Sequence, residues 1–374
     1  MAHIDLIKIN SFRGIKELSV SDFSKVNLIV GDNNSGKTTF LEAIQLLFVK
    51  TQLGALKNVI KQRTVLNPQK NNFYVSFIKM FNIEQQMEHL EFDIYAKSNA
   101  GILRFQLAGR ERIISGYEAL ESSSLSTNDK MRYRRTSAAL PEKAKIFIGE
   151  IFAQNGNRTA GKEVICTSLD SGLPGTTIQK EIQYIPSFGH LRYDLLQNIV
   201  DNPEYKKLAI DVLREFDADI EDICYTKADD GSFLETIITK NGSNIPFSVY
   251  GDGIKKILYI LNKLFDSSDS ILLIDEIETG LHKKYYDTLF PVVFALAEKL
   301  NVQLFIATHS NEAIDAILKY GNYENKKENE DAIKVITLKK IGSKDGNGSN
   351  VIARNVTGRY VYENRKVFDF EVRL

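Results

Sequence analysis

One short loop, Gly31–Thr38, restricts the fold of this chain more than any other feature. Its sequence, Gly-Asp-Asn-Asn-Ser-Gly-Lys-Thr, fits the pattern Gly-x4-Gly-Lys-Ser/Thr. An apolar run, Val26–Val30, precedes the loop, and the apolar residues of Thr38–Leu47 recur at helical spacing after it. A strand, a glycine-rich turn and a helix in this order direct backbone N–H groups and the positive end of the helix at phosphate. The pattern therefore predicts an α/β nucleotide-binding fold with Gly31–Thr38 as its phosphate loop.

The residue types within the phosphate loop predict how a nucleotide is held. Lys37 supplies a cation for the β and γ phosphates, and the Thr38 hydroxyl is placed to ligate Mg²⁺. Further contacts are expected from the loop backbone and the start of the helix, at Gly31, Asn33, Asn34, Ser35, Gly36 and Thr39. We expect ATP with Mg²⁺ as the ligands, although phosphate recognition by itself does not distinguish ATP from GTP.

Two later apolar runs each end in polar residues. Ile271–Ile274 is followed by Asp275 and Glu276, and Leu304–Ala307 leads to His309. Open α/β sheets bind ligands at the carboxyl ends of their strands. We predict Asp275 as a second Mg²⁺ ligand, Glu276 as the general base that polarises the attacking water, and His309 as a hydrogen-bond donor to the γ phosphate. Taken alone, each run is also compatible with a charged turn or a histidine without a catalytic role.

A second glycine-rich loop, Ser248–Gly253, stands directly before a predicted helix, Ile254–Leu264. Glycines at the start of a helix form an anion site, so Ser248, Gly251 and Gly253 are candidate phosphate contacts. Two separated anion sites in one chain indicate that the second serves a nucleotide held by another copy. The alternative is a plain turn at a helix start.

Charge and composition limit the partners of the chain. Lys+Arg and Asp+Glu both number 48, so no net charge draws the protein to nucleic acid or to a membrane. The basic runs 50–70 and Lys130–Arg135 leave DNA open as a partner, although a solvated helix edge is the favoured interpretation of the first run. Cys166 and Cys224 have neither disulfide-scaffold nor metal-site spacing, and no apolar run approaches the length of a membrane span. We expect a cytoplasmic protein.

The remaining patterns predict one discontinuous domain. We expect an N-terminal half, 1–110, with the phosphate loop; a polar and broken insertion forming a helical second lobe, 111–240; and a C-terminal half, 241–374, with the later motifs. Further expected elements are a strand at Ile4–Ile9, an antiparallel pair around 89–96 and 102–109, a strand at 181–186, a helix at 205–216, a hairpin within 221–240, a helix near 283–300, and strand-like runs in the last 40 residues or so. Together these predict a mixed central sheet flanked by helices.

These motifs, in this order, resemble the ABC-type ATPase heads of the SMC, RecF and OLD (overcoming lysogenization defect) group. Ile9–Ile15 is similar to the first strand of that group, whose arginine at the position of Arg13 approaches the nucleotide. Asp275–His282 resembles the OLD-like and AAA-type form of the motif, which implies that Glu278 and His282 lie at a dimer interface. By the same resemblance, Ser248–Gly253 corresponds to the signature loop, the name used for it below.

The resemblance implies an ATP hydrolase that works as a homo-oligomer. Two copies would pack head to tail, each holding ATP between its own phosphate loop and the signature loop of the other. Transporter-type members carry a glutamine where this chain has Ser187, and too few residues follow His309 for a Toprim nuclease. We therefore expect an ATP-driven switch, the sensor or regulator of a bacterial anti-phage system with a separate effector (a nuclease or toxin). The alternative is a RecF-like DNA-binding repair or replication ATPase.

Overall fold

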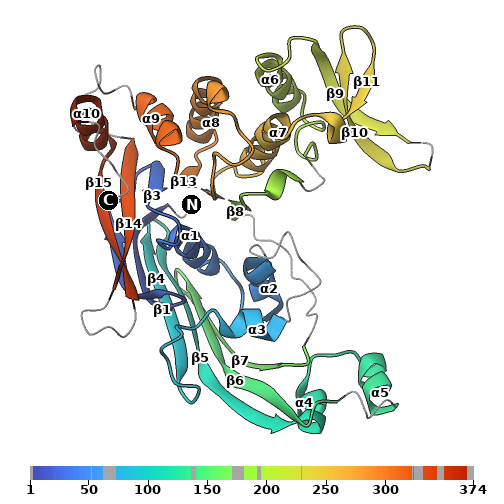
Figure 1. Ribbon diagram of the computed structural model, residues 1–374, viewed down its shortest axis with the longest axis vertical. Coiled ribbons are helices and arrows are strands. Elements are labelled where there is room, and N and C mark those ends of the chain that lie inside the picture. The colour runs from blue at the N-terminus through green and yellow to red at the C-terminus, as the bar shows by residue number, and fades with distance from the viewer. Residues whose placement is uncertain are drawn as a thin grey trace.

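The computed structural model describes residues 3–51, 53–61, 73–135, 140–170, 181–191, 195–228, 230–321, 323, 332–342 and 349–368. Within these ranges the strands form two six-stranded sheets and one three-stranded sheet. Figure 1 shows the two large sheets on either side of the helix α1 (Lys37–Leu46). The phosphate loop therefore enters the molecule between its two main layers.

The sheet that carries the predicted motifs has the strand order β15-β14-β3-β13-β12-β8. Five of its strands are parallel, and β15 pairs antiparallel at one edge. The strands are β3 (Val26–Val30), β8 (Ile182–Ile185), β12 (Ile271–Ile274), β13 (Gln303–Thr308), β14 (Ile333–Gly342) and β15 (Ser349–Thr357). Every residue of β3, β8, β12 and β13 is buried, as expected for parallel strands covered on both faces.

The other large sheet is antiparallel, with the order β2-β1-β4-β5-β6-β7. Its strands are β1 (Ile4–Phe12), β2 (Ile15–Ser21), β4 (Leu90–Ser98), β5 (Gly101–Ser115), β6 (Lys143–Asn155) and β7 (Arg158–Thr167). The helix α1 lies between the two large sheets, and α2 (Leu53–Lys61) and α3 (Phe73–Ile78) follow it over the same face of the antiparallel sheet. The core that they share includes Phe12, Phe40, Phe92 and Phe305, all without exposed surface. Packing against both sheets fixes the direction of α1 and of the loop at its start.

The opposite face of the parallel sheet is covered by a second layer of helices, visible along the top of Figure 1. They are α6 (Pro203–Arg214), α7 (Asp252–Phe265), α8 (Tyr286–Lys299), α9 (Asn311–Lys319) and α10 (Gly358–Phe368). Next to α6 and α7 stands the small sheet of β9 (Ile220–Lys227), β10 (Phe233–Thr239) and β11 (Asn244–Pro246). The helices α4 (Gly116–Ser122) and α5 (Thr127–Arg135) lie at the far end of the antiparallel sheet. None of the helices in the described ranges is long and apolar enough to cross a membrane.

The structure confirms the predicted α/β fold and its mixed sheet, and corrects the description of the middle of the chain. We expected residues 111–240 to form an inserted helical lobe, but β5 runs to Ser115 and pairs with β6, which pairs with β7. Residues 143–167 therefore extend the N-terminal sheet. The polar segment Asn155–Asn157, interpreted as a break, forms the tight turn between β6 and β7. The helix α10 was also missed, because the last 40 residues or so were expected to alternate strands and turns.

Candidate nucleotide site

The phosphate loop joins the buried strand β3 to α1 through backbone angles and close contacts that require glycine. Gly31 has φ +149°, Asn34 +65° and Gly36 +102°. A Cβ atom on Gly31 would lie 2.3 Å from the carbonyl oxygen of Leu338 on β14. Glycine at position 31 is thus required both by the backbone angle and by the close approach of a neighbouring strand. Gly36 is the N-cap of α1, so the loop ends where the helix exposes its first N–H groups.

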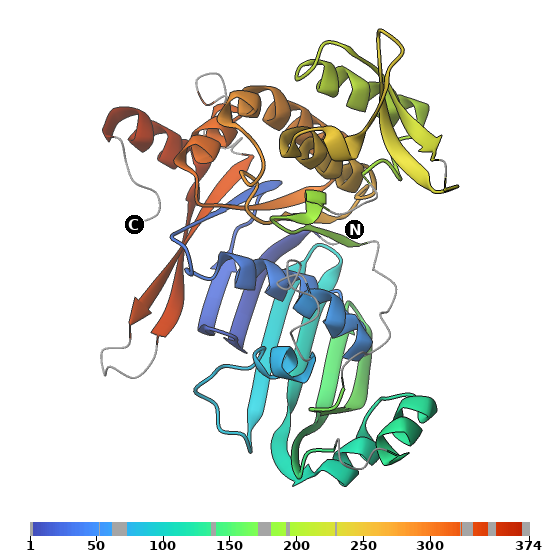
Figure 2. The ribbon, with the colours of Figure 1, turned by 45° about the vertical axis from the view of Figure 1, so that its right-hand side comes forward.

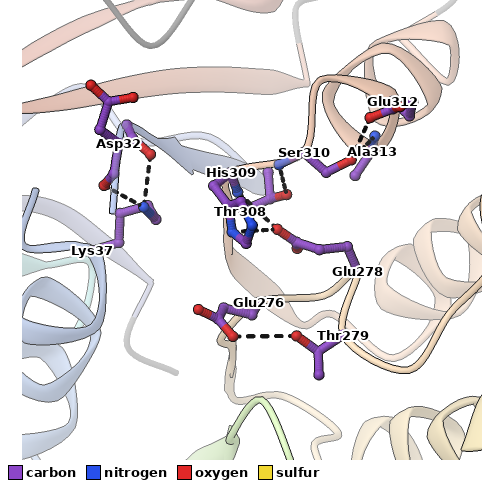
Figure 3. A network of polar contacts seen from close by, with 11 residues as sticks. Asp32, Lys37, Glu276, Glu278, Thr279, Thr308, His309, Ser310, Glu312 and Ala313 are labelled. Atoms are coloured by element: carbon purple, nitrogen blue, oxygen red, sulfur yellow. Dashed lines mark hydrogen bonds and ion pairs between the residues drawn. The ribbon is translucent and has the colours of Figure 1, made fainter. Parts of the chain in front are cut away.

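Lys37 holds its ammonium group inside the loop. Its Nζ donates hydrogen bonds to the carbonyl oxygens of Gly31, at 2.7 Å, and Asp32, at 2.8 Å. Burial lowers the pKa of Lys37, an effect opposed by the nearby carboxylates, of which Asp275 acts most strongly. Figure 3 shows Lys37 and Asp32 opposite His309 and Glu276, which come from the ends of β13 and β12. A phosphate group placed in this loop would meet the ammonium and the loop backbone together.

The predicted metal ligands, Thr38 and Asp275, are in direct contact. Thr38 Oγ1 donates to Asp275 Oδ2 at 2.8 Å, and the Tyr184 hydroxyl donates to the same oxygen at 3.1 Å. Asp275 is only 5% exposed, and its Oδ1 has no hydrogen-bond partner among the described residues. Burial raises the pKa of this carboxyl group, while its hydrogen bonds with Thr38 and Tyr184 oppose the shift. A buried carboxylate oxygen that accepts no hydrogen bond from the described residues is a suitable ligand for a cation.

Mg²⁺ fits this pair of residues when it arrives with a nucleotide. Mg²⁺ prefers oxygen ligands and commonly uses one or two protein groups together with phosphate oxygens and water. Thr38 and Asp275 supply such groups at the end of the phosphate loop. No group of three or more His, Cys, Asp or Glu side chains in the described ranges could hold a metal ion. The two protein oxygens would leave the other positions around a Mg²⁺ ion to phosphate and water.

Glu276, the predicted base, follows Asp275 in a strained backbone conformation. Its φ is +46°, a region that residues other than glycine rarely occupy and that is concentrated at functional sites. The Thr279 hydroxyl donates to Glu276 Oε2 at 3.2 Å. In Figure 3 the Glu276 carboxylate points toward the side of the phosphate loop, away from Glu278. The geometry is suited to a base acting on water beside a bound phosphate.

His309 is oriented by Glu278 from the loop that follows β12. The His309 backbone N–H donates to Glu278 Oε1 at 2.9 Å, and the ring Nδ1 lies 2.9 Å from the same oxygen. The ring nitrogen Nε2 is then the one left to donate to a ligand. Sequence analysis gave Glu278 a place at a dimer interface, which stays a prediction. The structure adds a contact within the chain that fixes the histidine.

Replacing Glu278 with alanine is expected to lower kcat about 10- to 100-fold, the usual effect of losing a hydrogen bond to a charged group, with ATP affinity little changed. The exposed Glu298 on α8, changed to alanine, is the matched control. Steady-state ATPase kinetics measure both. If Glu278 acts through His309, adding His309→Ala to Glu278→Ala costs little more, since the two changes remove one interaction. Additive losses would show that the two side chains act separately.

The signature loop is exposed at the start of α7. Ser248 and Gly251 are exposed, and Gly251 is the N-cap of this 14-residue helix without a side-chain hydrogen bond. A Cβ on Gly253 would lie 3.5 Å from the carbonyl oxygen of Gly280, so the loop packs beside the segment that follows Glu276. Its contact with a nucleotide stays a prediction, and the structure leaves its helix end open to a ligand from outside the chain.

Arg13 has a partner within the fold. Its Nε lies 2.9 Å from Glu42 Oε2, and NH1 donates to the Lys79 carbonyl oxygen at 3.3 Å. Glu42 is fully buried on α1, so this ion pair braces the helix that begins at the phosphate loop. The predicted approach of Arg13 to the nucleotide stays a prediction.

Three residues near the site were not found from the sequence: Tyr184, His190 and Lys256. Tyr184 donates to Asp275, Lys256 is fully buried and donates to the Ser187 carbonyl oxygen, and His190 lies against Gly280. A signal for Lys256 was available, because Ile260 and Leu264, four and eight residues later on the same helix face, are apolar. No comparable signal marks Tyr184 or His190.

A phosphate loop after a buried parallel strand, with Asp275, Glu276 and His309 at the ends of β12 and β13 of the same sheet, defines a P-loop nucleoside triphosphatase. The family model "AAA ATPase domain" matches residues 3–182. A second AAA domain model, whose description names the AbiEii toxin and type IV TA systems, matches residues 170–315. The chain is an ATP hydrolase, and two consecutive parts of it match AAA-type domain models.

Similar proteins include an "ATP/GTP phosphatase" of Helicobacter pylori, 23% identical over 333 residues, which make up 84% of this chain and 87% of the relative. A "DNA replication and repair protein RecF" of Idiomarina loihiensis is 48% identical over 44 residues, 12% of each chain. Among solved structures, an SMC head domain from Thermotoga maritima matches with a TM-score of 0.45 and 11% identity, over 95% of this chain and 100% of that one.

Proposed function

We propose that this ATPase is an ATP-driven switch in which two copies join head to tail around ATP and separate after hydrolysis. The observation that carries the proposal is the exposed start of α7, where the signature loop ends in a helix N-terminus without a side-chain cap. Such an end attracts phosphate. The phosphate loop lies elsewhere in the chain, before α1, and the γ phosphate held there is the group that the partner's signature loop would bind.

The chain's own residues carry the hydrolysis in this proposal. Lys37 and the N–H groups of the phosphate loop hold the β and γ phosphates, and Thr38 and Asp275 hold Mg²⁺, which supplies charge neutralisation when bound. Glu276 accepts a proton from a water molecule, and the oxygen of that water attacks the γ phosphorus. The bond between the γ phosphorus and the bridging oxygen breaks, and this oxygen leaves as part of ADP. His309, held by Glu278, donates to a γ-phosphate oxygen. The products are ADP and inorganic phosphate.

The biological role that we propose is that of the sensor or regulator ATPase in an OLD-like bacterial anti-phage system with a separate nuclease or toxin. Two observations support it: the form of the segment Asp275–His282, and the match to the AAA domain model whose description names a toxin of type IV TA systems. Loss of phage protection on deleting the gene, together with an effector that co-purifies with the ATPase, tests this role. A RecF-like DNA-repair role is the competing proposal, supported by the RecF match.

Replacing Gly251 with aspartate is expected to abolish ATP-dependent dimerisation and to leave ATP binding intact. Gly251 has φ −64°, and a Cβ there meets nothing within 4 Å, so the chain accommodates the side chain. The added carboxylate would repel the γ phosphate of the partner's nucleotide. Light scattering after gel filtration, with ATP and with ADP, measures the dimer. Gly342→Asp, at a second open glycine, is the matched control.

A dimer that forms equally well in Gly251→Asp would refute the head-to-tail arrangement. Hydrolysis that is stimulated by DNA, with an affinity for DNA that falls steeply as salt rises, would favour the RecF-like role instead.

A further inference from the structure

Tyr184 is a buried residue that none of the steps above uses. It lies on β8, the strand that pairs with β12 on the side away from β13. Its ring belongs to the apolar core that the parallel sheet shares with α1, and only 9% of its surface is exposed. Its hydroxyl donates to Asp275 Oδ2 at 3.1 Å. One side chain thus links the core to the acid that is proposed to hold Mg²⁺.

The register between β8 and β12 explains why the hydroxyl reaches Asp275. Tyr184 lies opposite Leu273 in this parallel pair, and Asp275 comes two residues after Leu273. Aligned residues of neighbouring strands, and residues two apart in one strand, have their side chains on the same face of a sheet. Tyrosine combines an apolar ring, which suits the core, with a polar tip, which needs a hydrogen-bond partner when it is buried. The carboxylate at the end of β12 supplies that partner.

The hydrogen bonds made to Asp275 distinguish its two carboxylate oxygens. Oδ2 accepts from the Tyr184 hydroxyl and, at 2.8 Å, from Thr38 Oγ1. A carboxylate oxygen has about two lone-pair sites, so Oδ2 is saturated. Oδ1 is buried and accepts no hydrogen bond from the described residues. Because the two donors come from different elements, β8 and α1, they hold the carboxylate in one orientation and leave Oδ1 as the oxygen available to a cation.

We propose that Tyr184 is a positioning residue for Mg²⁺, which holds Asp275 so that Oδ1 meets the ion. This inference rests on the proposed Mg²⁺ site at Thr38 and Asp275. A group that hydrogen-bonds to a metal ligand fixes the orientation of that ligand, and its loss usually lowers metal affinity by about 10- to 100-fold. Without the Tyr184 hydroxyl, Thr38 is the one donor to Oδ2 that remains in the described part of the chain, and the carboxylate can turn.

The test compares Tyr184→Phe with Tyr74→Phe, since each change removes one hydroxyl and keeps the ring. Tyr74 is the matched control because it is also buried and its hydroxyl donates, at 2.9 Å, to the buried carboxylate of Glu111 on the antiparallel sheet. The affinity for a fluorescent, non-hydrolysable ATP analogue is measured with EDTA and with saturating Mg²⁺. The ratio of the two affinities is the contribution of the metal ion. Thermal unfolding checks that each variant folds.

In the wild type and in Tyr74→Phe we expect the same gain in affinity from Mg²⁺. In Tyr184→Phe the affinity with EDTA should be unchanged, because Lys37 and the loop backbone remain in place, and the gain from Mg²⁺ should be smaller by about 10- to 100-fold. The Mg²⁺ concentration that gives half-maximal ATP turnover should rise by a similar factor.

An unchanged gain from Mg²⁺ in Tyr184→Phe overturns the proposal. A loss of affinity with EDTA as large as the loss with Mg²⁺ also overturns it, because the tyrosine then shapes the nucleotide site without acting through the metal ion. A Tyr184→Phe chain that does not fold assigns the hydroxyl a structural role and overturns the proposal as well. A wild type whose affinity does not respond to Mg²⁺ refutes the metal site itself, before any variant is compared.

Discussion

Glu276→Gln is expected to slow ATP hydrolysis by about 100- to 10,000-fold, the contribution that a general base usually makes, while ATP binding persists. Glutamine has the same shape as glutamate, so the strained backbone at φ +46° and the contact with Thr279 survive the change. Only the ability to accept a proton is lost. Because the γ phosphate then remains in place, the proposed dimer should accumulate with ATP and should not with ADP.

Single-turnover hydrolysis and light scattering on the same samples measure both effects. Glu298→Gln, on the exposed side of α8, should behave as the wild type. If Glu276→Gln turns ATP over at the wild-type rate, another group is the base. If Glu276→Gln hydrolyses ATP slowly but stays monomeric with ATP, the result supports Glu276 as the base and refutes the head-to-tail switch.

The elements that carry the site were predictable because each is short, apolar and ended by a polar motif. The run Val26–Val30 and the run Ile271–Ile274 have the same bounds in the structure as in the sequence analysis. Both are buried on two faces, so their apolar composition is continuous and needs no knowledge of the partner strands. The phosphate loop followed from its glycines and lysine together with the apolar run before it and the helical spacing after it.

The antiparallel sheet was harder to predict because one face of its outer strands is exposed. Along β7 most residues are exposed, and Gly161 interrupts any apolar pattern. Its pairing with β6 comes from the ladder of backbone hydrogen bonds and from the turn at Gly156, which has φ +58°. Since β-propensity depends strongly on neighbouring strands, polar composition alone gave a false impression of an insertion.

Contacts between distant segments could not be read from the sequence at all. The approach of Tyr184 to Asp275 joins residues 91 positions apart, and that of Lys256 to Ser187 joins residues 69 apart. The first depends on β8 lying beside β12, and the second depends on α7 lying next to the end of β8. Sequence analysis noted only that Ser187 stands where transporter-type relatives have a glutamine. The structure shows that its backbone carbonyl, which any residue would supply, receives the buried lysine.

Lys37→Met is expected to weaken ATP binding by about 100-fold or more, because two charge-assisted hydrogen bonds to phosphate are lost at once. Methionine keeps the apolar stem, which is buried at the start of α1. It also removes the donor to the carbonyl oxygens of Gly31 and Asp32, so the loop loses its internal brace as well as its charge. Fluorescent ATP analogue titration measures the affinity, and Lys8→Met, at an exposed position on β1, is the control.

Lys37→Met should lose ATP binding, whereas Glu276→Gln should lose turnover and keep ATP binding. Lys37→Met binds ATP weakly, so at ATP concentrations too low to fill its site no γ phosphate is present and no ATP-dependent dimer forms. Saturating ATP should partly restore dimers in Lys37→Met if the lysine acts mainly in binding. Full affinity with no dimers would instead mean that Lys37 shapes the phosphate for the partner's signature loop, and full affinity with normal dimers and turnover would remove Lys37 from the site.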